Sequence, residues 1–309
     1  MPTVIPPVDK LPLAVRKQVR DGFDSKKADL EANLSKLLGV PWKIDINPNA
    51  IWVYAAEDDY AKTNLGYCIE AYVSSAFNSI KYFLEDMGHG QPGKDEINSV
   101  CSNHTLTMAM DEAGKISYCG CDVHEGMLRI LFNPKYLGTN HNDALQKLED
   151  VLSTAASSSS LSYSARHSIE ESWDKNIPEI QAKVAKHLKN PAIKLNPNWE
   201  EVFAALRVDA AVKAEEGWDK RIGMYMKAYF EAFAYALEYN KFEEDEMLRE
   251  GFEEVVSKGE VKFRIVKELT PGGYYNESVV EDGILYMQTQ AKNWGVNNDT
   301  IATKIVDIL

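Results

Sequence analysis

The sequence predicts an α+β protein that carries two copies of one small domain in tandem. Three observations point to this architecture. The chain of 309 residues is long enough for two ordinary domains. A serine run, Ser157 to Ser160, lies near its centre and is typical of a linker, because it buries little apolar surface. The two halves also share a series of residues in the same order.

The shared residues fall at nearly constant separations. Lys36 and Pro41 match Lys186 and Pro191, 150 positions later. Further along each half the separation is 157, and the matching pairs include Gly66 with Gly223, Tyr72 with Tyr229, Tyr82 with Tyr239, Gly138 with Gly295 and Asn140 with Asn297. We therefore expect an extended N-terminal segment at 1–11, a first repeat over 12–153, a Ser/Ala-rich linker over 154–163 and a second repeat over 164–309.

Each repeat is expected to open with an amphipathic helix. In the first repeat this helix spans about 14–38, where apolar residues recur at spacings of three, four or seven. These residues are Val19, Phe23, Leu30, Leu34 and Leu37. The corresponding residues of the second repeat are Ile169, Trp173, Ile180, Val184 and Leu188.

A short helix is expected next. In the first repeat, residues 51–54 have strand propensity. Their counterpart at 198–205 reads as a helix, with Asn198 as N-cap and Glu201 at the capping-box position. Because related segments adopt the same structure, we predict a helix in both repeats.

The remainder of each repeat predicts a long apolar helix, three strands and a closing helix. The expected ranges are 65–87 and 219–242 for the long helix, 104–110, 115–122, 126–133, 260–267, 273–280 and 284–290 for the strands, and 141–153 and 298–308 for the closing helix. Each repeat is then α-α-α-β-β-β-α with a small antiparallel sheet. Two such copies are expected to pack about a pseudo-two-fold axis.

The overall charge and the cysteine content narrow the class of protein. A net charge of −13, with no basic stripe, argues against nucleic acid as a partner. The N-terminus lacks the pattern of a signal peptide and no apolar stretch reaches the length of a membrane span, so we expect no membrane association and a cytoplasmic location. The four cysteines all lie in the first half, which does not resemble a disulfide framework.

Two motifs suggest bound phosphate or metal. The segment Gly88–Lys94 matches a phosphate loop by letter, but a helix precedes it and Asp95 follows the lysine. We interpret it as a helix end followed by a loop, and we expect no cofactor. The residue types that could bind zinc are also grouped in this half, and they are Cys101, His104, Cys119, Cys121 and His124.

The metal site is weighed against a structural role for the same cysteines. Their spacing is not that of a zinc knuckle. If residues 112–115 form a hairpin turn, Cys119 lies opposite Met108 and Cys121 opposite Leu106. Both thiols would then share the apolar face of the sheet, where free cysteine behaves as a small hydrophobic residue. We therefore favour buried cysteines over a metal site or a reactive thiol.

The aromatic residues of the long helices are the main candidates for a binding site. We expect Tyr72, Phe77, Tyr225, Tyr229 and Phe233 to line a cleft for a ligand. No nucleophile, histidine and carboxylate form a recognisable catalytic pattern. The leading hypothesis is a non-catalytic binding protein, which uses the surface between the repeats or an aromatic cavity for a protein partner or a small apolar ligand. The alternative is a cytoplasmic enzyme with its site in one repeat or between the two.

Overall fold

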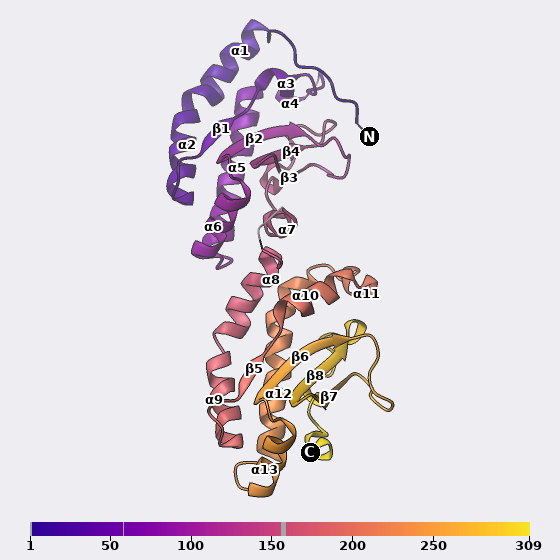
Figure 1. Ribbon diagram of the computed structural model, residues 1–309. Helices are drawn as coiled ribbons and strands as arrows, with labels where there is room; N and C mark the ends of the chain where they lie inside the picture. The colour runs from indigo at the N-terminus through magenta and orange to yellow at the C-terminus, as the bar shows by residue number, and fades with distance from the viewer. Residues whose placement is uncertain (1, 58, 156–158) are drawn as a thin grey trace. The chain divides into compact units, whose positions relative to one another are not determined.

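The computed structural model describes residues 2–57, 59–155 and 159–309. The chain forms two compact units that divide between residues 158 and 159, and each mixes helices with one four-stranded sheet (Figure 1). Part of the predicted linker, residues 156–158, lies outside the described residues. Among the described helices, none has the length and apolar character needed to cross a bilayer.

Unit 1 is the N-terminal half of the chain. Its elements are α1 (Leu13–Val19), the π-helical segment η1 (Arg20–Asp24), α2 (Ser25–Leu38), β1 (Lys43–Asp45), α3 (Pro48–Trp52), α4 (Tyr60–Thr63), α5 (Leu65–Glu85), α6 (Gly90–Val100), β2 (Thr105–Met110), β3 (Cys119–His124), β4 (Met127–Phe132), the 3-10 turn η2 (His141–Asp143) and α7 (Leu148–Thr154). β2, β4 and the central helix α5 lie where the sequence predicts them, whereas β3 begins four residues later than predicted and β1 was not predicted.

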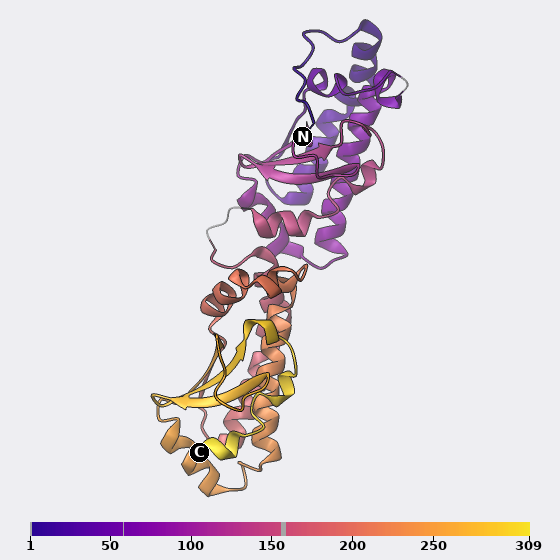
Figure 2. The same cartoon turned by 90° about the vertical axis from the view of Figure 1, so that its right-hand side faces the viewer.

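Unit 2 repeats this order with small differences. Its elements are α8 (Tyr163–Ser168), the π-helical segment η3 (Ile169–Asp174), α9 (Ile177–Leu188), β5 (Lys194–Asn196), α10 (Trp199–Val208), α11 (Ala210–Lys213), η4 (Trp218–Arg221), α12 (Ile222–Tyr239), α13 (Glu246–Val255), β6 (Glu260–Val266), β7 (Asn276–Glu281), β8 (Ile284–Gln290), η5 (Ala291–Asn293), η6 (Asn298–Thr300) and η7 (Ile305–Ile308). Figure 2 shows α9 and α12 against one face of its sheet.

Both sheets are mixed, and the prediction of an antiparallel sheet is wrong. The strand orders are β1-β2-β4-β3 and β5-β6-β8-β7. In each sheet the first two neighbouring pairs are parallel and the edge strand, β3 or β7, is antiparallel to its neighbour. The loop after β2 carries the chain past the position of β4, so β2 and β3 do not form a hairpin. The tight hairpin joins β3 to β4 through Glu125 and Gly126, whose positive φ angles of 49° and 70° suit a type I′ turn.

This topology also corrects the predicted cysteine neighbours. Cys119 lies opposite Phe132 and Cys121 opposite Ile130, both on β4, rather than opposite Met108 and Leu106 on β2. The prediction paired β2 with β3, which are consecutive in sequence, whereas β4 lies between them in the sheet. Cys119 and Cys121 are half-buried rather than buried as predicted, although Ile130 opposite Cys121 is fully buried.

The helices follow the predictions in part, and α4, α11 and α13 are additional helices that were not predicted. The opening helix contains a π-helical segment at the same place in both units, η1 and η3. The segment from Gly90 onward, expected to be a loop, forms α6. The closing helix of unit 1 is shorter than predicted, and in unit 2 the predicted closing helix is wrong, because the range 298–308 forms the 3-10 turns η6 and η7. Both segments follow an asparagine in the left-handed conformation, Asn140 or Asn297, each with φ of 49°.

A close crossing of two helices joins the opening and central helices of each unit. Gly66 at the start of α5 donates a hydrogen bond from its amide to the Gln18 side chain, and Gly223 of α12 donates to Ser168 Oγ at 3.0 Å. A Cβ atom at Gly223 would lie 2.5 Å from the carbonyl carbon of Ser168. Only glycine allows this approach, and the π-helical segment begins immediately after the crossing in each unit.

Candidate functional site

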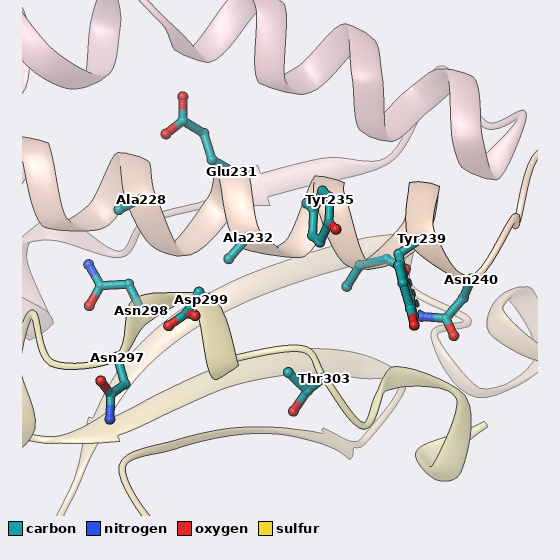
Figure 3. Close-up of a pocket in the computed structure, with 11 residues that line it drawn as sticks. Ala228, Glu231, Ala232, Tyr235, Tyr239, Asn240, Asn297, Asn298, Asp299 and Thr303 are labelled. Atoms are coloured by element: carbon teal, nitrogen blue, oxygen red, sulfur yellow. Dashed lines mark hydrogen bonds between the residues drawn. The ribbon is translucent and has the colours of Figure 1, made fainter.

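An open groove lies between α12 and the C-terminal segment of unit 2 (Figure 3). Its volume is about 810 Å³, within the range usual for small-molecule sites. Its lining residues come from one turn after another of α12 and from the segment around η6. They are Ala228, Glu231, Ala232, Tyr235, Ala236, Tyr239, Asn240, Asn297, Asn298, Asp299 and Thr303.

One wall of the groove is set by the periodicity of α12. Residues four positions apart lie on the same face of a helix, so Ala228, Ala232 and Ala236 form a continuous strip of methyl groups. Tyr235 and Tyr239 are related in the same way, and their rings lie 6.1 Å apart at an angle of 33°. Both tyrosines are exposed, by 64% and 73%. The helix therefore presents aromatic rings beside a strip that no long side chain fills.

The opposite wall is fixed by hydrogen bonds from the core. Tyr229 Oη accepts a hydrogen bond from the Gly295 amide at 3.1 Å, and Asn276 Nδ2 donates to the Asn297 carbonyl at 2.7 Å. Tyr229 is fully buried on α12, so the helix and the C-terminal segment are held together beneath the groove. The left-handed conformation of Asn297 then turns η6 toward α12, where it packs.

The polar groups of the groove are amides, hydroxyls and two carboxylates. The Oδ1 atom of Asn298 is buried and has no hydrogen-bond partner among the described residues. Asp299 is exposed at the same end of the groove. Glu231 points away from the C-terminal segment in Figure 3, and its carboxylate lies 3.4 Å from Lys227 Nζ. No lysine or arginine is among the described residues that line the groove.

Unit 1 has a different chemistry at the corresponding place. Ser75 of α5 takes the position of Ala232, and its hydroxyl lies 2.9 Å from Nδ1 of His141, the counterpart of Asn298. The same hydroxyl lies 3.4 Å from Asn142 Oδ1. Ser75 is only 7% exposed, so its hydroxyl ties α5 to η2 instead of facing an open substrate site. In unit 2 the alanine removes this bridge.

The aromatic residues predicted from the sequence lie mainly in the cores. Tyr72, Tyr229 and Phe233 are fully buried, whereas Phe77 and Tyr225 are half-buried. Burial raises the pKa of Tyr72, and it raises the pKa of Tyr229 to about 12. These buried rings do not line the groove of Figure 3.

The two tyrosines that do line the groove, Tyr235 and Tyr239, are not among the binding residues predicted from the sequence. They lie further along the helix that carries the predicted residues. The available signal was a pair of tyrosines four positions apart on the polar side of α12, next to alanines at 228, 232 and 236.

The candidate metal ligands are not brought together. Cys101 is buried, and Cys119 on β3 donates a hydrogen bond from Sγ to the Asn140 carbonyl at 3.0 Å. The His104 ring packs 5.8 Å from the Trp42 ring, while His124 is exposed next to Glu125. Within the described part of the chain, no three histidine, cysteine or acidic side chains are grouped as a metal site would require.

The cysteine thiols are poorly suited to act as nucleophiles. Burial raises the pKa of Cys121 to about 12, and burial together with the Asp143 carboxylate raises the pKa of Cys119 to about 11. A thiol with so high a pKa contains almost no thiolate at neutral pH, and the thiolate is the reactive form. Reactive cysteine chemistry is therefore disfavoured at this strand.

Each unit has a smaller groove beside its edge strand. In unit 1 it has a volume of about 500 Å³ and runs between β3 and α7; in unit 2 it has a volume of about 340 Å³ and runs between β7 and η7. The linings correspond in position: Cys119, Cys121 and Lys147 in unit 1 match Asn276, Ser278 and Lys304 in unit 2. The groove of unit 2 also carries an exposed ring pair, Tyr274 and Tyr275, whose centroids lie 6.2 Å apart, but its lining contains no strip of alanines.

Comparison with known proteins gives no match: no protein family, no curated protein and no solved structure is similar to this chain.

Proposed function

We propose that this protein binds a small ligand with an apolar or aromatic body in the groove between α12 and η6, without converting it chemically. The observation that carries the proposal is the pair of exposed rings, Tyr235 and Tyr239, beside a strip of alanines in a groove of about 810 Å³. When an apolar ligand covers exposed aromatic rings beside an unfilled groove, the free energy of the system falls, because apolar surface is removed from water.

Removal of one ring gives a direct test. Indole serves as a neutral aromatic probe, with binding measured by saturation-transfer NMR. A ring contact is worth about 0.5–1.5 kcal/mol, so we expect Tyr239→Ala to weaken indole binding about 2- to 10-fold. Tyr82→Ala is the matched control, because Tyr82 holds the corresponding place on α5 and is also exposed, by 59%. This control is expected to leave the affinity unchanged.

Filling the groove gives the complementary test. Ala232→Leu adds an apolar side chain to the strip of alanines, and Ala232 is a half-buried residue that lines the groove. We expect the folded protein to keep its stability and to lose indole binding, as followed by the same NMR measurement. If indole fails to bind the native chain, or binds equally to the filled variant, the groove is not the ligand site. A protein partner at this surface would then have to be considered.

We also propose that the two units derive from duplication of one domain. The support is the set of equivalent details: strand order, π-helical segments after the helix crossing, and amides of Gly138 and Gly295 donating to Tyr72 and Tyr229.

The free state of all four cysteines supports a reducing compartment such as the cytoplasm.

A further inference from the structure

We infer that the groove takes an arylalkylamine, which is a flat aromatic ring that carries a positively charged nitrogen on a short carbon arm. This inference rests on the proposed function, and it adds the chemical class of the ligand. Figure 3 places Asn298 and Asp299 beside Ala228 and Ala232, at one end of the groove, and the two tyrosines at the other. The groove thus has a polar end and an aromatic end.

The polar end is suited to a cationic hydrogen-bond donor. The buried Oδ1 of Asn298 has no partner among the described residues, and leaving a buried acceptor unpaired costs free energy. A ligand nitrogen would pair with this atom only after the side chain turns toward the groove, because the atom has almost no accessible surface. Asp299 supplies a negative charge next to it, and the described lining contains no cation that would compete for either group.

The spacing along the helix sets the length of the ligand. Ala232 and Tyr235 are three residues apart on α12, which corresponds to about 4.5 Å along the axis. An arm of about two carbons has a similar length, so we expect a ring packed on Tyr235 to place its nitrogen beside Ala232, where Figure 3 shows Asp299. The tyrosine faces also attract a cation, which adds to the same preference.

The corresponding position in unit 1 lacks both features. His141 replaces Asn298 and is occupied by Ser75, and Asn142 replaces Asp299 without a charge. The carboxylate therefore occurs in the unit whose helix carries the exposed tyrosine pair. Glu231 is a lesser contributor, because Lys227 lies 3.4 Å from its carboxylate and the side chain points away from the C-terminal segment.

Three probes with the same ring separate the charge from the ring. They are indole, which is neutral, tryptamine, whose amine is protonated at neutral pH, and indole-3-propionate, which is an anion. We expect tryptamine to bind the native chain about 3- to 10-fold more tightly than indole, and the anion to bind more weakly than indole. Because the Asp299 carboxylate is exposed, a higher salt concentration is expected to reduce the preference for tryptamine over indole.

A substitution at the carboxylate assigns the effect to Asp299. Asp299→Asn is expected to bring the affinities of tryptamine and indole to within about twofold of each other, with indole itself unchanged. Asp307→Asn is the control, since it makes the same change in net charge at an exposed residue outside the groove lining. It is expected to leave the preference for tryptamine intact.

The outcomes distinguish this inference from the proposal beneath it. If indole binds at the groove and tryptamine binds no more tightly, the amine inference fails and the groove remains a ligand site. A tryptamine preference that survives Asp299→Asn also overturns the inference. If neither probe binds in a way that Ala232→Leu abolishes, the proposed function itself fails.

Discussion

Gly223→Ala is expected to destabilise unit 2 by about 3 kcal/mol, at the upper end of the cost of overpacking. An alanine Cβ at this position would lie 2.5 Å from the carbonyl carbon of Ser168 and closer still to its oxygen. The obstacle is backbone rather than a flexible side chain, so α12 and α8 must move apart. That movement would also break the buried hydrogen bond from the Gly223 amide to Ser168 Oγ.

Hydrogen exchange followed by mass spectrometry is the appropriate measurement. Peptides from α12 are expected to exchange faster in the variant, whereas peptides from α5 in unit 1 serve as an internal reference. Gly251→Ala is the matched control, because its Cβ would meet only Leu309 at an ordinary 3.8 Å and the helix α13 gains up to about 1 kcal/mol of intrinsic propensity. Unchanged protection of α12 in Gly223→Ala would contradict the role assigned to this crossing.

Gly66→Ala is expected to act in the same way on unit 1. The added Cβ would lie 2.6 Å from the Gln18 carbonyl oxygen and 2.7 Å from the Val19 Cα. Faster exchange is then expected in α5, with α12 as the reference. The two glycines together test whether one packing solution supports both units.

The helices could be predicted because their apolar spacing is long and regular. The central helices α5 and α12 carry buried residues along most of their length, and strand β2 alternates cleanly between buried and half-buried positions. The sheet order could not be predicted in this way. Three-residue strands such as β1 are too short to give a pattern, and pairing order depends on where the loop after β2 crosses the sheet.

The groove could be predicted only in part. The aromatic character of α12 was visible, but periodicity places Tyr229 and Phe233 on the core face and Tyr235 and Tyr239 toward the surface. Which of these faces meets open space depends on the left-handed turn at Asn297, a tertiary feature. The unpaired Asn298 oxygen is likewise a consequence of Ala232 standing where unit 1 has Ser75.

Alkaline solution is expected to unfold unit 1 before unit 2. Cys68 and Cys101 of unit 1 are buried, and burial raises the pKa of each thiol from 9.0 to about 12. Below pH 9 these thiols are protonated in both the folded and the unfolded chain, so they leave the free energy of unfolding at its full value. As the pH rises from 9 to about 12, the unfolded chain releases protons that the folded unit retains, and the free energy of unfolding falls.

The slope of this fall distinguishes the two units. These two thiols contribute up to about 3 kcal/mol per pH unit within that window, and the raised pKa values of Cys119 and Cys121 add to the same slope. Unit 2 contains no cysteine, and its buried phenol Tyr229 has a pKa raised from 10.0 to about 12. Tyr72, its counterpart in unit 1, also has a raised pKa. Each unit therefore has one buried phenol that lowers its stability in alkaline solution, whereas the buried thiols lower the stability of unit 1 alone.

Urea unfolding at a series of pH values, observed by fluorine NMR of fluorotryptophan-labelled protein, reports on each unit separately. Trp42 and Trp52 lie in unit 1, whereas Trp173, Trp199, Trp218 and Trp294 lie in unit 2. Cys101→Ala is the control: it lowers the stability of unit 1 at neutral pH through the cavity it leaves, but it reduces the alkaline slope by about 1.4 kcal/mol per pH unit. The slope therefore separates proton linkage from packing, and equal slopes in the two units would contradict the assigned role of the buried thiols.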